Sequence, residues 1–318
     1  MTLHLACAAD ESYVGHCAAM LHSVVTRNPE SAIQVHFLHD PGFSLDCQEK
    51  LRTVVEGGGG RVRFLAIEDS AVAGLPVMGR IPRIMWYRVF LPERLPEIDR
   101  VLYLDADTLA MDSLRPLWET DLGDGYVAAV SGVFEPHYAD RPRALGLPEG
   151  QEYFNSGVLL FNLEAMRADR CTTRIVDFAR GQDLLWPDQD ALNVVLGGRR
   201  VHLHPRWNCM NSLFLFPQAR TVFGHQMVRD ACRDPGILHF EGPDLAKPWH
   251  YLSKHPFRRA YRRHRAETPW PKVAVEGRTW QNRLLKPLPA RATIKILTHW
   301  PRVRARLRTA RLRRRPTR

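Results

Sequence analysis

Two aspartates, Asp105 and Asp107, directly follow an apolar run at residues 101–104 and are separated by a single alanine. Carboxylate oxygens are hard ligands that suit Mn²⁺ or Mg²⁺, and such an ion can in turn bind a diphosphate. Residues two apart in an extended chain point to the same side, so we expect both carboxylates to reach one ion. Paired carboxylates beside a buried strand repel each other, and this favours a bound cation over a solvated turn.

A histidine and a lysine further along the chain could complete a site for a metal and a phosphate. His239 follows the short apolar run 236–238 and is the candidate third metal ligand, which would give a mixed oxygen and nitrogen site suited to Mn²⁺. A histidine satisfied inside the core remains the alternative. Lys247 lies eight residues later and could neutralise a phosphate, although an ordinary exposed lysine fits the same pattern.

Two further clusters carry polar side chains next to apolar segments. Asp188, Gln189 and Asp190 stand at the start of a helical pattern, where they could hold sugar hydroxyls or simply cap the helix. Asn155 and Ser156, followed by a glycine, precede an apolar run, where they could hydrogen-bond a sugar or form a turn. Both interpretations stay open at this point.

The pattern of apolar residues predicts the elements that would position these groups. The first 67 residues alternate between strand and helix patterns, which indicates a mostly parallel sheet with flanking helices. In such sheets ligands bind beyond the carboxyl ends of the strands, so Asp10, the 105–107 pair and His239 are expected to share one crevice. We expect strands at 3–9, 33–38, 61–67, 101–104, 127–130, 158–161 and 237–240, and helices at 14–26, 45–56, 84–90 and 188–196.

Three boundaries follow from weaker signals. The helical stretch 84–90 is expected to stop at Pro92, and residues 242–249 are expected to form a loop. After about residue 255 the apolar pattern thins and no sustained repeat remains. We therefore predict a catalytic domain over residues 1–255 and a basic C-terminal segment over residues 256–318.

The positive charge of the chain is concentrated in that segment. The net charge is +11, yet residues 278–318 hold 14 Lys or Arg and no Asp or Glu, and the rest of the chain carries 31 basic against 34 acidic residues. The basicity therefore belongs to a tail, which argues against a nucleic-acid-binding domain.

The cysteines and the N-terminus bear on the cellular compartment. The six cysteines include no closely spaced pair, which is typical of reduced thiols in a cytosolic protein. No secretory signal pattern and no run of about 20 apolar residues is apparent. These features predict a cytoplasmic protein.

Taken together, the motifs resemble those of glycosyltransferase family 8, the retaining α-hexosyltransferases, and most of all the bacterial lipooligosaccharide galactosyltransferases; glycogenin shares the same core. Order and spacing agree over roughly residues 1–250. The matching pieces are Ala8-Ala9-Asp10 with Tyr13, Tyr87-Arg88, Tyr103-Leu104-Asp105-Ala106-Asp107, Phe154 to Leu163, Asp188 to Asn193, His239-Phe240 and Lys247-Pro248-Trp249.

The resemblance implies a GT-A fold, UDP-hexose as the donor and Mn²⁺ or Mg²⁺ as the cofactor. By position, the metal ligands would be Asp105, Asp107 and His239, and Gln189 would face the anomeric carbon beside Asp190. The implied donor-binding residues are Ala8, Asp10 and Tyr13 at the nucleoside, Arg88, Asn155, Ser156, Asp188 and Gln189 at the sugar, and Ala106, Gly242 and Lys247 along the remaining contacts.

The chain departs from the closest relatives at three places. The segment from Gly242 to Lys247 is about two residues longer, Arg80 stands where the relatives carry a histidine, and Ser12 stands where they often have asparagine. The choice between galactose and glucose as donor sugar therefore stays open. So does the choice between front-face attack by the acceptor and a covalent intermediate, although the amide of Gln189 is a poor nucleophile and favours the former.

The acceptor and two other functions complete the predictions. The basic, Trp-containing tail Arg291–Arg318 is expected to attach the protein to the anionic inner face of the cell membrane, which fits a saccharide acceptor linked to lipid, such as a lipopolysaccharide core. Leu104 to Thr108 also fits the nucleophile motif of haloacid-dehalogenase-type phosphatases, with Asp105 attacking and Asp107 as acid and base. A non-catalytic relative that only binds nucleotide sugar is the other alternative.

Overall fold

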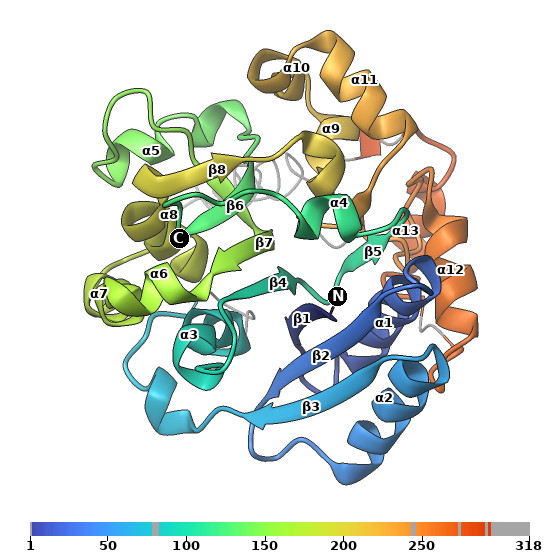
Figure 1. Ribbon diagram of the computed structural model, residues 1–318. Helices are drawn as coiled ribbons and strands as arrows, with labels where there is room; N and C mark the ends of the chain where they lie inside the picture. The colour runs from blue at the N-terminus through green and yellow to red at the C-terminus, as the bar shows by residue number, and fades with distance from the viewer. Residues whose placement is uncertain (1, 78–82, 243–245, 273–274, 290–291, 294–318) are drawn as a thin grey trace, which may run out of the picture. The chain divides into compact units, whose positions relative to one another are not determined.

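The structure, a computed structural model, describes residues 2–77, 83–242, 246–272, 275–289 and 292–293 (Figure 1). The chain forms two compact units. The first holds residues up to Glu241 together with Arg263–Lys272, and the second holds the described residues of 242–262 and those from 275 onward. The division between a catalytic domain and a basic segment near residue 255 concerns function and stays a prediction. Arg80 and residues 294–318 of the expected membrane-binding tail lie outside the described residues.

A seven-stranded sheet forms the centre of the first unit, in the order β3-β2-β1-β4-β7-β6-β8. β3, β2, β1 and β4 run parallel, β7 runs antiparallel to both β4 and β6, and β8 is parallel to β6. This is the mostly parallel α/β architecture that the sequence predicts. The strands are β1 (Thr2–Ala8), β2 (Ala32–His39), β3 (Arg61–Ala66), β4 (Arg100–Leu104), β6 (Val127–Ser131), β7 (Phe154–Asn162) and β8 (Arg200–His202).

Helices pack against this sheet because its central strands are apolar on both faces. On one face, Leu3, Leu5 and Cys7 of β1 are completely buried, and the Cys7 sulfur lies 3.7 Å from that of Cys17 in helix α1. The other face of the central strands forms a core cluster with residues of the 3₁₀ helix η2 (Arg83–Phe90) and of α6, α7 and α8. These helices are α1 (Val14–Arg27), α2 (Leu45–Gly57), α6 (Leu163–Ala168), α7 (Cys171–Ala179) and α8 (Pro187–Leu196).

A second, three-stranded sheet in the same unit has the order β5-β10-β9. β10 pairs antiparallel with β5, so that His239 lies opposite Thr108, and it pairs parallel with β9. The predicted strand near residue 237 is present, and it lies in this small sheet because β5 turns away from β4 after the aspartate pair. The three strands are β5 (Thr108–Ala110), β9 (Cys209–Met210) and β10 (Ile237–His239).

Several predicted boundaries need correction. Residues 83–90 form a 3₁₀ helix, η2, and Pro92 does not end it but lies in the first turn of helix α3 (Leu91–Arg94), where a missing backbone N–H costs nothing. Asn155, Ser156 and a glycine are part of β7 and form no turn. Among the described residues beyond 255, the structure has the helices α12 (Arg258–Ala266) and α13 (Trp280–Leu285).

The remaining helices are short, and none was predicted. They are α4 (Arg115–Trp118), α5 (Arg141–Ala144), α9 (Asn211–Leu215), α10 (Gln218–Phe223), α11 (His225–Arg233) and the 3₁₀ turns η1 (Asp69–Val72), η3 (Pro136–Tyr138), η4 (Gly197–Arg199) and η5 (Pro205–Asn208). Across the described ranges, no helix combines the length and apolar character needed to span a membrane.

One buried histidine pair in the first unit makes stability depend on pH. The Nδ1 atoms of His264 in α12 and His22 in α1 lie 3.0 Å apart. Burial, followed by the positive charges of His22 and nearby arginines, lowers the pKa of His264 to about 4. The unfolded chain therefore binds a proton there at a higher pH than the folded protein does. This contribution to stability is present above about pH 6.5 and is lost as the pH falls towards 4.

We expect His264→Gln to make the free energy of unfolding less dependent on pH between about 6.5 and 4. Urea denaturation at a series of pH values measures this slope, and His225→Gln, at an exposed histidine on α11, serves as the control. An identical pH slope for His264→Gln and the unsubstituted protein would contradict the assignment.

Candidate active site

The two aspartates of the Asp-x-Asp motif lie in a tight turn between β4 and β5. The backbone N–H and the hydroxyl of Thr108 both donate to the carbonyl oxygen of Asp105. The two carboxylates do lie on one side, but the predicted cause, an extended chain, is wrong. The turn, and not a β-strand, directs both side chains towards His239.

Asp105, Asp107 and His239 form a cluster whose ligand atoms all lie within 4.8 Å of one another. His239 Nε2 is 3.4 Å from a carboxylate oxygen of Asp107 and 3.8 Å from one of Asp105. The pairing of β10 with β5 produces this approach, and it is secured where the Phe240 N–H donates to the carbonyl oxygen of Asp107. Two hard oxygens and one imidazole nitrogen suit Mn²⁺ or Mg²⁺.

Asn208, which the sequence analysis missed, holds His239 in the orientation that a metal ligand needs. The Nδ1 of His239 lies 2.9 Å from Asn208 Oδ1, an arrangement in which Nδ1–H donates and Nε2 keeps its lone pair for an ion. Burial lowers the pKa of His239, but the hydrogen bond to Asp107 and the charges of both aspartates raise it overall. The cluster therefore attracts positive charge.

A glycine in β7 is required beside this cluster. A Cβ atom at Gly157 would lie 2.1 Å from His239 Cε1 and 2.8 Å from a carboxylate oxygen of Asp105. The Gly157 carbonyl also accepts the backbone N–H of Asp105. Close packing against the cluster therefore explains why glycine follows the Asn155-Ser156 pair.

Arg88 joins the cluster to the start of helix α8. Its guanidinium is buried, lies 2.9 Å from Asp105, and donates to the carbonyl oxygen of Ser156 at 2.6 Å. Its Nε lies 3.3 Å from Asp188. Arg88 also stacks over the ring of Tyr103, with 4.4 Å between the guanidinium carbon and the ring centroid. The structure thus brings Arg88, Asp105, Ser156 and Asp188 together, as the sequence predicts.

Asp188 is a buried carboxylate with an atom left for a ligand. Its Oδ2 is the oxygen that lies 3.3 Å from Arg88 Nε, and within the described residues it accepts no hydrogen bond. Burial raises the pKa of Asp188 to about 6, and the charge of Arg88 limits the rise. The possibility that Asp188 caps α8 is excluded, because Trp186 occupies the N-cap position.

Gln189 is held rigidly through both ends of its amide. Its Oε1 accepts from the side chain of Asn155 at 3.1 Å, and from the backbone N–H and hydroxyl of Ser156 at 2.9 and 3.3 Å. Its Nε2 donates to the hydroxyl of Tyr153 at 3.1 Å. Tyr153, like Asn208, had not been singled out from the sequence.

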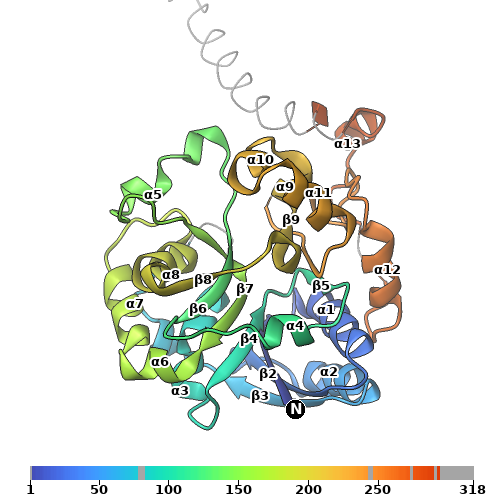
Figure 2. The same ribbon diagram turned by 45° about the horizontal axis from the view of Figure 1, so that its top comes forward.

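Asp190 is completely buried and fully engaged by other protein groups. It accepts from the Tyr153 hydroxyl at 2.7 Å and from the Trp186 backbone N–H at 3.0 Å, and it forms an ion pair with Arg141 of α5 at 2.5 Å. Figures 1 and 2 both show α5 beside α8. An aspartate four residues after the N-cap that accepts from the N-cap N–H stabilises the start of the helix.

The remaining predicted residues fall into two groups. β1 pairs with β4 such that Ala6 lies opposite Tyr103, and this places Ala8 and Asp10 beside the Asp105 end of the sheet. Asp10 accepts from the hydroxyl of Ser12 and from the N–H of Tyr13, the N-cap residue of α1. Gly242 and Lys247 belong to the second unit, where the Lys247 ammonium lies 5.8 Å from the ring centroid of Trp249.

We expect Asn208→Ala to weaken Mn²⁺ binding by about 10- to 100-fold, because the His239 ring would lose its orienting partner. Calorimetric titration of the purified chain with Mn²⁺ measures the affinity, with Gln226→Ala at an exposed position of α11 as the control. Equal Mn²⁺ affinity in the Asn208→Ala variant and the unsubstituted protein would show that Asn208 does not orient a ligand.

Known proteins share both this sequence pattern and this fold. The family model for glycosyl transferase family 8 matches residues 4–253. General stress protein A of Bacillus subtilis is 27% identical over 275 residues, which cover 84% of this chain and 94% of that protein. Lipopolysaccharide 1,2-glucosyltransferase of Escherichia coli K12 is 27% identical over 274 residues, covering 84% and 79%.

A solved structure supports the same relationship. The galactosyltransferase LgtC in complex with donor and acceptor sugar analogues is 28% identical and superposes with a TM-score of 0.70, covering 85% of this chain and 96% of that one. This likeness agrees with the predicted GT-A fold. The chain therefore belongs to glycosyl transferase family 8.

Proposed function

We propose that this glycosyltransferase moves a hexose, galactose or glucose, from a UDP-sugar to a saccharide acceptor with retention of anomeric configuration. The observation that carries the proposal is the convergence of Asp105, Asp107 and His239 next to the buried pair of Arg88 and Asp188. A divalent ion and the polar groups of a sugar would then have adjoining places in one site.

The three clustered ligands would hold Mn²⁺ or Mg²⁺. Such an ion, when bound, offsets the charge that develops on the diphosphate as the glycosidic bond breaks. Lys247, and the backbone at Gly242, would contact the same diphosphate. Ala8, Asp10 and Tyr13 would line the nucleoside, and Ala106 lies in the turn between the two metal-binding aspartates.

The donor sugar would be held by Arg88, Asp188 and the Asn155-Ser156 pair. Asp188 Oδ2 is suited to accept a sugar hydroxyl because it lacks another donor among the described residues. This oxygen has an ion pair with Arg88 but no hydrogen bond, and a sugar hydroxyl would supply the missing donor. Arg88 keeps this carboxylate charged by its proximity.

Front-face attack by the acceptor hydroxyl fits the arrangement of Gln189 and Asp190 better than a covalent intermediate does. The Gln189 oxygen already accepts hydrogen bonds from three donors, and an amide is a poor nucleophile. Asp190 is enclosed by Arg141, Tyr153 and the Trp186 N–H and has no exposed surface. We therefore assign Asp190 the role of fixing Tyr153 and, through it, the amide of Gln189.

Three half-buried aromatic rings beside Gln189 support a saccharide acceptor. The ring of Phe134 lies 5.0 Å from that of Tyr153 and 5.7 Å from that of Trp186, and Tyr138 lies 5.1 Å from Trp186. Sugar-binding sites combine such apolar faces with a few placed polar groups. The names of the lipopolysaccharide-modifying relatives favour a lipid-linked acceptor. The basic segment 256–318 would then attach the enzyme to the inner face of the membrane.

The two other candidate functions fit less well. A haloacid-dehalogenase-type phosphatase would use Asp105 and Asp107 alone, whereas here His239 and Arg88 contact the same carboxylates. Membership in family 8 also points to glycosyl transfer. A non-catalytic relative would have no need for the completely engaged amide of Gln189.

We expect the purified protein to release UDP from UDP-galactose or UDP-glucose in the presence of Mn²⁺ and to do so slowly even without an acceptor. Asp105→Asn should reduce this release by about 100-fold or more, because it removes a charged ligand. Asp121→Asn, at an exposed aspartate, is the matched control. If neither sugar nucleotide is consumed with Mn²⁺ or with Mg²⁺, the proposal fails. Release of phosphate from phosphomonoesters would instead support the phosphatase.

The pKa of about 6 at Asp188 predicts the acid side of the pH profile. Below that pH the carboxyl becomes protonated and loses both its charge opposite Arg88 and its capacity to accept a sugar hydroxyl. With saturating Mn²⁺, kcat/KM for the donor should therefore fall as the pH drops through about 6.

In the Asp188→Asn variant kcat/KM should be lower at every pH and should lack this fall. Asp183→Asn, at an exposed aspartate ahead of α8, should keep the profile of the unsubstituted enzyme. If kcat/KM of Asp188→Asn still falls below about pH 6 as in the unsubstituted enzyme, a group other than Asp188 causes the fall.

A further inference from the structure

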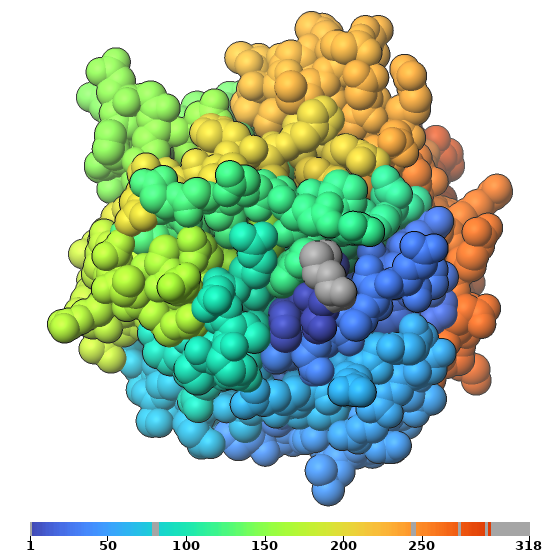
Figure 3. Space-filling model, in the orientation of Figure 1, coloured from blue at the N-terminus to red at the C-terminus, as the bar shows by residue number. Residues whose placement is uncertain are grey.

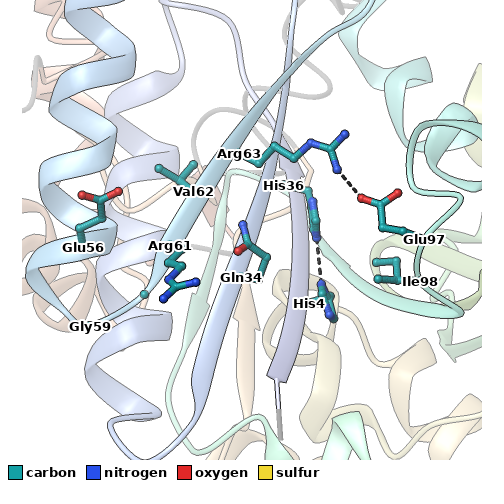
Figure 4. A pocket seen from close by; sticks show the side chains of 11 residues that line it. His4, Gln34, His36, Glu56, Gly59, Arg61, Val62, Arg63, Glu97 and Ile98 are labelled. Carbon is teal, nitrogen blue, oxygen red and sulfur yellow. Dashed lines mark hydrogen bonds and ion pairs between the residues drawn. The ribbon is translucent and has the colours of Figure 1, made fainter.

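A second hollow lies on the first unit, towards the amino ends of β1, β2 and β3 and away from the Asp-x-Asp turn. It measures about 840 Å³. In Figure 3 the N-terminal strand is visible at the floor of a recess between the segments that follow it, and Figure 4 shows the side chains around it. Its lining includes His4, Gln34, His36, Arg61, Arg63 and Glu97.

Strand register explains why these polar side chains gather. His4 pairs with Gln34, Gln34 with Arg61, and His36 with Arg63, so all five belong to one face of the sheet. The alternate residues of β1 and β2 on the opposite face, such as Leu5 and Val35, are completely buried. The amino ends of β1 and β2 are therefore amphipathic, whereas further along the same face Ala6, Ala8 and Leu38 belong to the apolar core.

His36 has a buried nitrogen without a partner. Its ring is only 2% exposed, its Nε2 lies 3.0 Å from Nδ1 of His4, and its Nδ1 has no hydrogen-bond partner within the described chain. If His4 Nδ1–H donates to His36 Nε2, then His36 Nδ1 carries a hydrogen that lacks an acceptor. A buried donor left in this way is costly, and an oxygen atom of a ligand would satisfy it.

The charges around His36 favour a negatively charged ligand. Arg61 lines the hollow and makes no ion pair in the described part of the chain. Arg63 pairs with Glu97, but both side chains are about half exposed, and such surface pairs are weak enough to give way to a ligand. Glu56 also lines the hollow, so two negative charges, Glu56 and Glu97, balance the charges of the two arginines before a ligand binds. Guanidinium and imidazole N–H groups are the donors that suit phosphate oxygens.

We propose that this hollow is a second ligand site, which binds a phosphate group through Arg61, Arg63 and the Nδ1–H of His36. The site is separate from the proposed donor site, and it would serve a phosphorylated saccharide or a phospholipid headgroup, whose phosphate chemistry is shared. Burial is the main cause that lowers the pKa of His4 and of His36, the latter to about 4. A bound anion favours the uptake of one proton by the His4–His36 pair, in which one of the two facing nitrogens still accepts, so binding should strengthen as the pH falls.

The test follows the imidazole nitrogens of His4 and His36 by ¹⁵N NMR while inorganic phosphate is added to the full chain at about pH 6.5. We expect saturable shifts of both rings. In the double variant Arg61→Ala/Arg63→Ala the apparent dissociation constant should rise by about tenfold or more. Arg229→Ala, which removes an exposed arginine of α11 outside the hollow, should leave it unchanged.

Two further titrations distinguish the sources of the phosphate. Glucose 6-phosphate and soluble dihexanoylphosphatidylglycerol are each added in place of inorganic phosphate, and the one that shifts the His36 signal at the lower concentration identifies the class. Absence of any shift, or shifts equal in the double variant and the unsubstituted protein, would overturn the proposal. The Arg61→Ala single variant repeats the comparison should the double variant not fold. None of these readouts depends on sugar transfer, so failure here leaves the proposed function untouched.

Discussion

The buried positive charge of Arg88 is the interaction on which the rest of the site depends. Burial alone would lower its pKa, but the negative charges of Asp105 and Asp188 raise it above the usual range. These partners come from the end of β4 and the start of α8, and the Ser156 carbonyl of β7 contributes a third contact. A charge removed from water must be paired, so three segments distant in sequence are fixed around one guanidinium.

A network of hydrogen bonds also connects the candidate metal ligands with the start of helix α8. Arg88 is linked to this network through Ser156, which donates to Gln189. The network runs from His239 through Asn208 to Asn155, from there to the amide of Gln189, and on through Tyr153 to the ion pair of Asp190 with Arg141. Networks of this kind are rigid when every member is satisfied. The geometry of the metal ligands is thereby coupled to the side chain that faces the reacting bond in the proposed mechanism.

The sequence was sufficient to predict the parts that depend on local pattern. The alternating strands and helices of the first 67 residues, and the place of the Asp-x-Asp motif at the end of β4, were predicted because apolar periodicity and carboxylate spacing are local signals. The turn of that motif and the small sheet were not predicted, since β5 and β9 are too short to show periodicity. Asn208, Tyr153 and Arg141 act through contacts that only the folded chain creates, so no sequence signal marked them.

The central claim is that Asp105, Asp107 and His239 hold a divalent ion that in turn binds the diphosphate of the donor. Titration of Mn²⁺ in the absence and in the presence of UDP tests it most directly, because two ligands that share a site raise each other's affinity by the same factor. The account predicts that UDP raises the affinity for Mn²⁺ and that Mn²⁺ raises the affinity for UDP by the same factor. In the Asp107→Asn variant neither ligand should raise the affinity for the other. Mn²⁺ and UDP affinities that are independent of each other would contradict it.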